Sequence, residues 1–181
     1  MLLAKTTLAG AVVVELEPRT DSRGFFARTF CREEFAAAGL NPMVDQCNVA
    51  YNHVAGTLRG MHFQLPPASE AKLVRCTRGA IVDIIVDMRP ESPTYLDHLA
   101  VELSAENRRA LYVPPMFAHG YMTLVDATEV AYQVSERYTP GLERGLRYDD
   151  PALALPWPRE VAVISEKDKG WPLLAPAGSR E

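Results

Sequence analysis

Short runs of alternating apolar and polar residues dominate the chain from residue 44 to residue 135. Val, Ile, Leu, Phe and Tyr recur there at every second position, which is the period of a β-strand with one buried face. Residues 2–16 have the same character and predict one or two strands that end before Pro18. The other predicted strands lie near residues 44–51, 57–64, 72–77, 81–88, 97–103, 109–113, 119–125 and 128–135.

Helical signals are sparse. Residues 33–38 predict one short helix, because they begin with acidic residues and are followed by Gly39. Residues 77–80 predict a tight hairpin between two strands, and the segment after Pro140 reads as loops with a polar stretch at 165–168. Many short strands with little helix predict an all-β sandwich or barrel. We find no linker or internal repeat, so residues 1–181 are expected to form one domain.

Composition narrows the class of protein. The chain has 181 residues, 48% of them hydrophobic, and a formal net charge of −4, which is typical of a soluble globular protein. The acidic balance argues against a nucleic-acid binder but leaves room for a local basic pocket. No apolar run approaches the roughly 20 residues of a membrane span. The three cysteines lack C-x-x-C spacing and predict reduced thiols in a cytoplasmic protein.

The predicted strand at 57–64 is unusual in its polar residues. It carries Arg59, His62 and Gln64, and Lys72 follows after a Pro-Pro turn. Each residue alone has an ordinary explanation as a solvated strand residue, but polar groups are costly in a sheet unless something uses them. The set therefore predicts a functional site.

Strand parity raises a difficulty for this site. His62 and Gln64 share one face of a regular strand, whereas Arg59 lies on the other face. Both Arg59 and His62 can line one pocket only if the strand bulges, and Gly60 is the plausible bulge residue. Otherwise Arg59 serves a different site or another subunit.

Two kinds of chemistry fit the histidines. A metal site would combine His62 with His119 and Glu70, but Gln64 stands where a second strand histidine would be expected, and an amide is a poor ligand for zinc or iron. Acid–base chemistry without a metal fits better, with His62 as the base. Asp168 or Asp83 would orient its ring.

Tyr132 is the matching proton-donor candidate. Its parity with two valines places it on the apolar face of its strand, where its hydroxyl is either a proton donor or a hydrogen-bonded core group. Phosphate-binding candidates are Arg23, Arg28, Arg59, Lys72 and Lys167, because arginine in particular makes bidentate contacts to phosphate. Arg28 and Lys167, each taken singly, are more simply explained as surface cations.

Read together, several stretches resemble the dTDP-4-dehydrorhamnose 3,5-epimerase family, a cupin-like jelly-roll group. The resemblance runs from the N-terminal strand to about Leu174. Its carriers are Asp21-Ser22-Arg23-Gly24-Phe25-Phe26, Gln46-Cys47-Asn48, the residues 57–64, Ala71-Lys72-Leu73, Phe117-Ala118-His119-Gly120-Tyr121, Glu143-Arg144-Gly145 and Ser165-Glu166-Lys167-Asp168.

The resemblance implies a role for each matched position. His62 is implied to be the general base with Asp168 as its orienting carboxylate, Lys72 the cation at the enolate oxygen, and Tyr132 the acid on the opposite face. Tyr138 matches an aromatic residue that stacks on thymine. The other implied ligand-binding positions are Arg23, Arg28, Gln46, Asn48, Arg59, His119, Glu143 and Lys167.

The resemblance also implies partners. The expected ligand is a dTDP-linked 4-keto-6-deoxyhexose, used without a metal or redox cofactor, and the expected assembly is a homodimer whose N-terminal strands complete each other's sites. Arg28 and Cys47 depart from the family pattern, where Glu and Asp are common. C3-only or other nucleotide-linked 4-keto-sugar epimerases share most of these motifs. A metal-dependent cupin enzyme and a non-catalytic sugar-binding cupin are the competing hypotheses.

Overall fold

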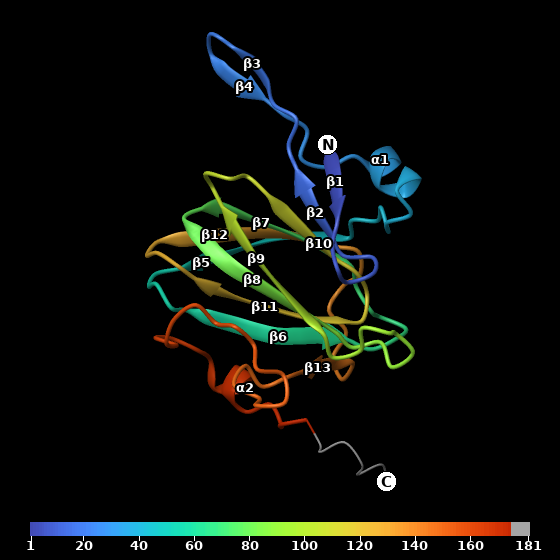
Figure 1. Cartoon of the computed structure of the whole chain (residues 1–181), viewed down its shortest axis with the longest axis vertical. Coiled ribbons are helices and arrows are strands. Elements are labelled where there is room, and N and C mark those ends of the chain that lie inside the picture. The colour runs from blue at the N-terminus through green and yellow to red at the C-terminus, as the bar shows by residue number, and fades with distance from the viewer. Residues whose placement is uncertain (175–181) are drawn as a thin grey trace.

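Two antiparallel β-sheets pack face to face in the computed structural model, which describes residues 1–174 (Figure 1). The last residues of the predicted domain, 175–181, lie outside this part. The six-stranded sheet has the order β1 (Leu2–Lys5), β2 (Val12–Glu15), β10 (Ala110–Val113), β7 (Lys72–Arg78), β12 (Thr128–Val134) and β5 (Gln46–Asn52). The five-stranded sheet has the order β13 (Glu143–Gly145), β6 (Leu58–Gln64), β11 (Phe117–Thr123), β8 (Ala80–Asp87) and β9 (His98–Ser104).

This arrangement confirms the predicted all-β, cupin-like jelly-roll sandwich. The predicted strands are present with bounds that differ by a few residues at most. Because apolar and polar residues alternate along these strands, each sheet has one apolar face, and the two apolar faces meet in one core. Val74 of β7 and Val130 of β12 there join Ile85 of β8 and Phe117 of β11, and all four are essentially buried.

The predicted hairpin at residues 77–80 is wrong. β7 ends at Arg78 and β8 begins at Ala80, but the two strands belong to different sheets and do not pair. The tight turn is real, and Gly79 makes it with a φ of +78°. It carries the chain from one sheet to the other, which strand alternation alone does not distinguish from a turn within one sheet.

Of the two alternatives that the sequence left open, a bulge at Gly60 or a separate site for Arg59, the structure has the bulge. His62 pairs with His119 and Arg59 with Tyr121, so two residues of β6 oppose the single residue Gly120 of β11. Gly60 has a φ of +120°, and a Cβ built on it would meet the Gly120 Cα and the His119 carbonyl oxygen. Only glycine fits this close approach. The bulge is what allows Arg59 and His62 to line one cavity.

Three further elements lie outside the sandwich. Helix α1 (Arg32–Ala37), close to its predicted range, buries Phe35 against the six-stranded sheet. The strands β3 (Arg19–Asp21) and β4 (Gly24–Phe26) form a hairpin that projects well away from both sheets (Figure 1). Helix α2 (Glu166–Lys169) is the third such element and was not predicted, and neither was β13 at the edge of the five-stranded sheet. None of the described helices is long and apolar enough to cross a membrane.

Asp87 fixes the loop that leaves β8. Its fully buried carboxylate accepts hydrogen bonds from Arg89 at 2.8 and 2.6 Å, from Ser92 Oγ at 2.6 Å and from Thr94 Oγ1 at 2.8 Å. Burial by itself would raise the pKa of Asp87, but these hydrogen bonds outweigh it and lower the pKa to about 2.

This pKa predicts a dependence of folding stability on acid. A carboxylate whose pKa is lower in the folded state stabilises the fold above its unfolded pKa, near 3.8, and loses this contribution as the pH falls toward about 2. We expect Asp87→Asn to lower the free energy of unfolding by about 2 kcal/mol at neutral pH and to flatten its decline below pH 4. Urea denaturation at several pH values measures both effects.

Asp97→Asn is the matched control, because Asp97 is exposed and its carboxylate has no hydrogen-bond partner among residues 1–174. Equal effects of the two substitutions would contradict the assignment.

Candidate functional site

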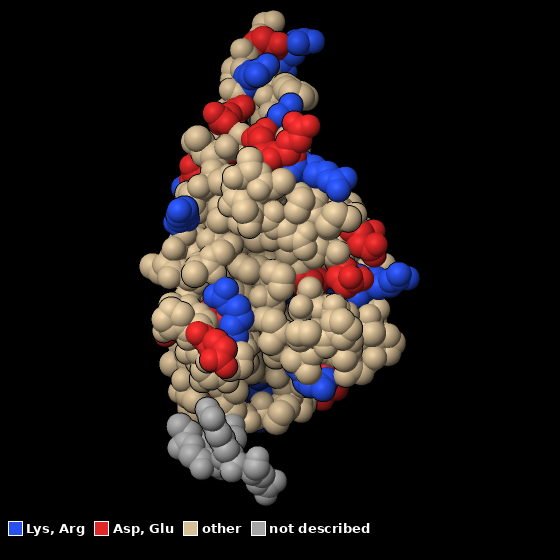
Figure 2. Space-filling model, turned by 90° about the vertical axis from the view of Figure 1, so that its right-hand side faces the viewer, with Lys and Arg blue, Asp and Glu red and all other residues tan. Residues whose placement is uncertain are grey.

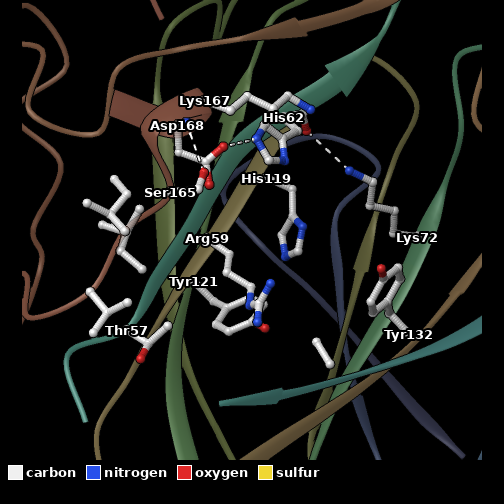
Figure 3. Close-up of a pocket in the computed structure, with 14 residues that line it drawn as sticks. Thr57, Arg59, His62, Lys72, His119, Tyr121, Tyr132, Ser165, Lys167 and Asp168 are labelled. Atoms are coloured by element: carbon white, nitrogen blue, oxygen red, sulfur yellow. Dashed lines mark hydrogen bonds and ion pairs between the residues drawn. The ribbon is translucent and has the colours of Figure 1, made fainter. Parts of the chain in front are cut away.

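A cavity of about 530 Å³ opens between the two sheets beside α2 (Figure 3). β6 and β11 form one wall, β7 and β12 contribute Lys72 and Tyr132 from the other sheet, and residues 163–168 close one side. A second hollow adjoins it and shares His62, Lys72 and Tyr132 with the first. Residues distant in the sequence therefore meet at one place.

His62 and Asp168 make the closest polar contact in this cavity. Asp168 Oδ1 lies 2.6 Å from His62 Nε2, and Asp168 Oδ2 accepts a hydrogen bond from the Gly60 N–H at 3.3 Å. Burial alone would raise the pKa of Asp168, but the His62 and Gly60 contacts outweigh it and lower the pKa. Asp168 is thus held as a carboxylate beside the imidazole, whereas Asp83, the other predicted partner, does not contact His62.

Lys72 reaches the same place from β7. Its ammonium donates to the His62 carbonyl oxygen at 3.2 Å and forms an ion pair with Glu70 Oε1 at 3.1 Å. Only 11% of the Lys72 side chain and 8% of that of Glu70 are exposed. A buried charge pair of this kind holds the ammonium at a fixed position.

Tyr132 faces His62 from the opposite sheet, on the strand next to that of Lys72. Its ring packs against the core, and its hydroxyl points into the cavity (Figure 3). Among residues 1–174 no group hydrogen-bonds this hydroxyl, so it is not the satisfied core tyrosine that was the alternative prediction. The oxygen is available to a molecule in the cavity.

His119 of β11 and Arg59 of β6 line the same cavity, and His119 stands opposite His62 in the sheet. The His119 Nε2 is 2.8 Å from Oδ1 of the fully buried Asp83, a close approach that is not aligned as a hydrogen bond. Arg59 Nε donates to the buried Asn52 Oδ1 at 2.8 Å. Within the described part of the chain, no group of three His, Cys, Asp or Glu side chains has the arrangement of a metal site.

The remaining predicted positions divide into two groups. Lys167 Nζ pairs with Glu143 at 2.6 Å at the rim, and the adjoining hollow is lined by Gln46, Asn48 and Tyr138. Arg23 and Arg28 do not come to either hollow. Arg23 is on the projecting hairpin with 88% of its side chain exposed, paired with Asp21, and Arg28 pairs with Glu34.

Charges of both signs cover the projecting hairpin, at the top of Figure 2. The ion pair between Arg23 and Asp21 belongs to this mixture. Because both partners are largely exposed, the pair stabilises the hairpin little and leaves the guanidinium free to exchange partners.

Several contacting residues escaped the sequence reasoning. Glu70 was considered only as a metal ligand, although its spacing of two from Lys72 on an extended segment places both side chains on one face. Trp171 stands edge-on to His62, with ring centroids 6.2 Å apart. The indole lies against Gly145, which pairs with His62 across β13 and β6. Trp171 lies in an irregular segment after α2, where no apolar–polar periodicity predicts that it would contact His62.

Known proteins are similar to this chain in sequence and in fold. A family model described as dTDP-4-dehydrorhamnose 3,5-epimerase matches residues 5–176. The dTDP-4-dehydrorhamnose 3,5-epimerase of Sinorhizobium fredii (strain NBRC 101917 / NGR234) is 43% identical over 171 residues, which cover 93% of this chain and 88% of the relative. The chain belongs to the dTDP-4-dehydrorhamnose 3,5-epimerase family. It is therefore an epimerase, as the resemblance in its sequence predicted.

Solved structures of this epimerase family have the same fold. The dTDP-4-dehydrorhamnose 3,5-epimerase of Bacillus anthracis str. Ames, solved with TDP and PPi bound, is 40% identical with a TM-score of 0.91 and covers 96% of this chain and 99% of its own. The dTDP-6-deoxy-D-glucose-3,5-epimerase of Legionella pneumophila Philadelphia 1, solved with dTDP-4-keto-L-rhamnose, is 33% identical with a TM-score of 0.88 and covers 95% and 92%.

The contact between Gly145 and Trp171 generates a test of the epimerase fold. A Cβ on Gly145 would overlap the indole, so we expect Gly145→Ala to lower the free energy of unfolding by about 1–3 kcal/mol. In a Trp171→Ala background the same substitution should cost much less, because the indole is gone. Urea denaturation of the two single variants and the double variant measures the coupling. Additive costs would show that the two residues do not touch.

Proposed function

We propose that the chain inverts C3 and C5 of dTDP-4-dehydro-6-deoxy-D-glucose to give dTDP-4-dehydro-L-rhamnose. The observation that carries this proposal is the meeting of His62, Asp168, Lys72 and Tyr132 around one cavity, with His62 and Asp168 on one side and Tyr132, beside Lys72, on the opposite sheet. The printed names of the relatives and the dTDP-sugar in the Legionella structure support the substrate class.

The chemistry needs only proton transfers. The C4 ketone acidifies the hydrogens on both neighbouring carbons, so a base can remove one and leave an enolate. His62 takes the proton at Nδ1, because its Nε2 faces Asp168 Oδ1, and the Asp168 carboxylate stabilises the imidazolium that forms. The Lys72 ammonium stabilises the enolate oxygen, and the Tyr132 hydroxyl delivers a proton to the other face of the carbon. Removal and return balance, so this scheme requires neither a redox cofactor nor a metal.

The nucleotide is proposed to lie in the adjoining hollow. Tyr138 has 59% of its surface exposed there and would stack on the thymine ring. Gln46 and Asn48 line the same hollow and would contact the base. The other matched positions, Arg59, His119, Glu143 and Lys167, would hold the sugar and the diphosphate.

We further propose a homodimer in which the β3–β4 hairpin crosses to the partner subunit. Within its own chain the hairpin contacts neither hollow, yet it carries Arg23 and leaves Phe26 with 73% of its surface exposed. An exposed phenylalanine beside an arginine suits a site that stacks and pairs with a nucleotide. Arg28, where many members have Glu, would follow it. The three free cysteines accord with the cytoplasmic location we propose.

Deuterium exchange separates removal of the proton from its return. In deuterated water, wild-type protein should give product labelled at C3 and C5. His62→Ala should lose exchange and inversion together, by on the order of 10² to 10⁴ in rate. Tyr132→Phe keeps the base, so recovered substrate should still gain deuterium while inversion falls sharply. NMR of both carbons measures each step and reveals inversion confined to C3. Normal inversion by Tyr132→Phe would remove the tyrosine from the mechanism.

Mixed dimers test the crossing hairpin. His62→Ala and Arg23→Ala chains should each be nearly inactive alone. When they are coexpressed, the heterodimer has one pocket with an intact His62 that receives an intact Arg23 from the partner, so roughly a quarter of wild-type activity should return. Chains carrying both substitutions, coexpressed with the wild type, control for expression. Absence of any recovery in a purified heterodimer would mean that Arg23 does not act across subunits.

A further inference from the structure

Gln64 is the buried polar residue of β6 that the proposed reaction leaves without a task. Its side chain is only 5% exposed, and both ends of its amide are occupied. Oε1 accepts a hydrogen bond from the Thr139 N–H at 2.7 Å. Nε2 faces three acceptors, which are the Ala68 carbonyl at 3.0 Å, the Arg137 carbonyl at 3.2 Å and Glu70 Oε2 at 2.9 Å, and it shares its two hydrogens among them.

These partners fix which end of the amide is which. If the amide were reversed, its NH₂ would face the Thr139 N–H and its oxygen would face two carbonyls and a carboxylate. The orientation is therefore determined by the surroundings. Only an uncharged group that accepts on one side and donates on the other satisfies this place, so a glutamate or a methionine at position 64 would leave buried groups unpaired.

The two ends of the amide belong to two different parts of the site. The Thr139 N–H and the Arg137 carbonyl flank Tyr138, so Gln64 holds the backbone on both sides of the proposed thymine-stacking residue. Glu70, held by the same Nε2, forms the ion pair with Lys72 Nζ at 3.1 Å. A displacement of the 137–139 segment would therefore move Gln64, then Glu70, and so change the position of the Lys72 ammonium.

We propose that Gln64 is a positioning residue that joins the nucleotide-binding wall to Lys72 through Glu70. Gln64 itself does not touch the reacting atoms in this scheme. It makes the position of the Lys72 ammonium depend on the position of Tyr138. A nucleotide stacked on Tyr138 would therefore favour the position of the ammonium that the reaction requires. This inference rests on the proposed function, because that function gives Tyr138 and Lys72 their tasks.

The test compares binding with turnover in two kinds of variant. Gln64→Met and Gln64→Glu remove the amide at similar volume, and each should weaken dTDP binding about tenfold and lower kcat about tenfold or more, at saturating substrate. Glu70→Gln is the matched variant, because its amide oxygen still accepts from Gln64 while the charge beside Lys72 is lost. It should lower kcat and leave the dTDP dissociation constant within about twofold. Calorimetry with dTDP gives both the affinity and the fraction of binding-competent protein.

The outcomes separate the inference from a loss of fold and from a failure of the proposed function. A destabilised variant would bind fewer dTDP molecules per chain at normal affinity, and thermal denaturation would detect it. Gln64 variants that lose only affinity, only turnover or neither overturn the inference, and so does Glu70→Gln with normal kcat, even if no Gln64 variant folds. If instead wild-type protein neither exchanges nor inverts the dTDP-linked 4-keto sugar, the proposed function fails first.

Discussion

The close approach of Gly60 to Gly120 is the constraint on which the cavity depends. β6 is an interior strand of its sheet, paired with β11 on one side and β13 on the other, so it cannot turn its side chains without losing backbone hydrogen bonds. The bulge gives it one extra residue opposite Gly120, and Arg59 and His62 then share a side. Any side chain at position 60 would meet the backbone of β11. The site is therefore built on an irregularity that the sheet tolerates only with glycine on both strands.

The same bulge also receives the C-terminal segment. Val163 lies beside Thr57 in a parallel bridge, and its carbonyl accepts from the Leu58 N–H at 2.8 Å. α2 follows, with Ser165 Oγ accepting from the Asp168 N–H at its first turn. Asp168 then contacts both the Gly60 N–H and the His62 ring. One carboxylate thus binds the freed backbone of the bulge and the imidazole that the bulge exposes, which ties two local features into one arrangement.

Most strands could be predicted from the sequence because the signal is local. A half-buried strand alternates apolar and polar residues along a few consecutive positions. The turn at residues 77–80 was misread because a tight glycine turn has the same signature whether its strands pair or separate into two sheets. Apart from the family resemblance, which implied Asp168, the pattern of residues left the choice between Asp168 and Asp83 open for a related reason. Both are acidic residues far from His62 in the sequence, and only the packing of α2 against β6 decides that Asp168 reaches it. Arg23 and Arg28 look like site residues by motif, but one chain cannot bring them there.

Charge pairing explains how a cavity rich in cations stays folded before a ligand arrives. Lys72 faces Glu70 and Lys167 faces Glu143, so each of these lysines has its own carboxylate, as the His62 ring has in Asp168, whereas Arg59 hydrogen-bonds the uncharged Asn52. Buried ion pairs are costly to break, and the pair of Lys72 and Glu70 is the most buried, so these two side chains stay in place when a substrate enters. The pairing also cancels much of the positive field of the two lysines, and leaves Arg59 as the cation without a carboxylate among the described residues that line this cavity. The exposed Arg23–Asp21 pair differs, because its interaction is weak in water and easily exchanged. In the proposed dimer, Arg23 on the hairpin would therefore add a positive charge that can pair with a diphosphate. The lysines of the cavity are already paired with carboxylates.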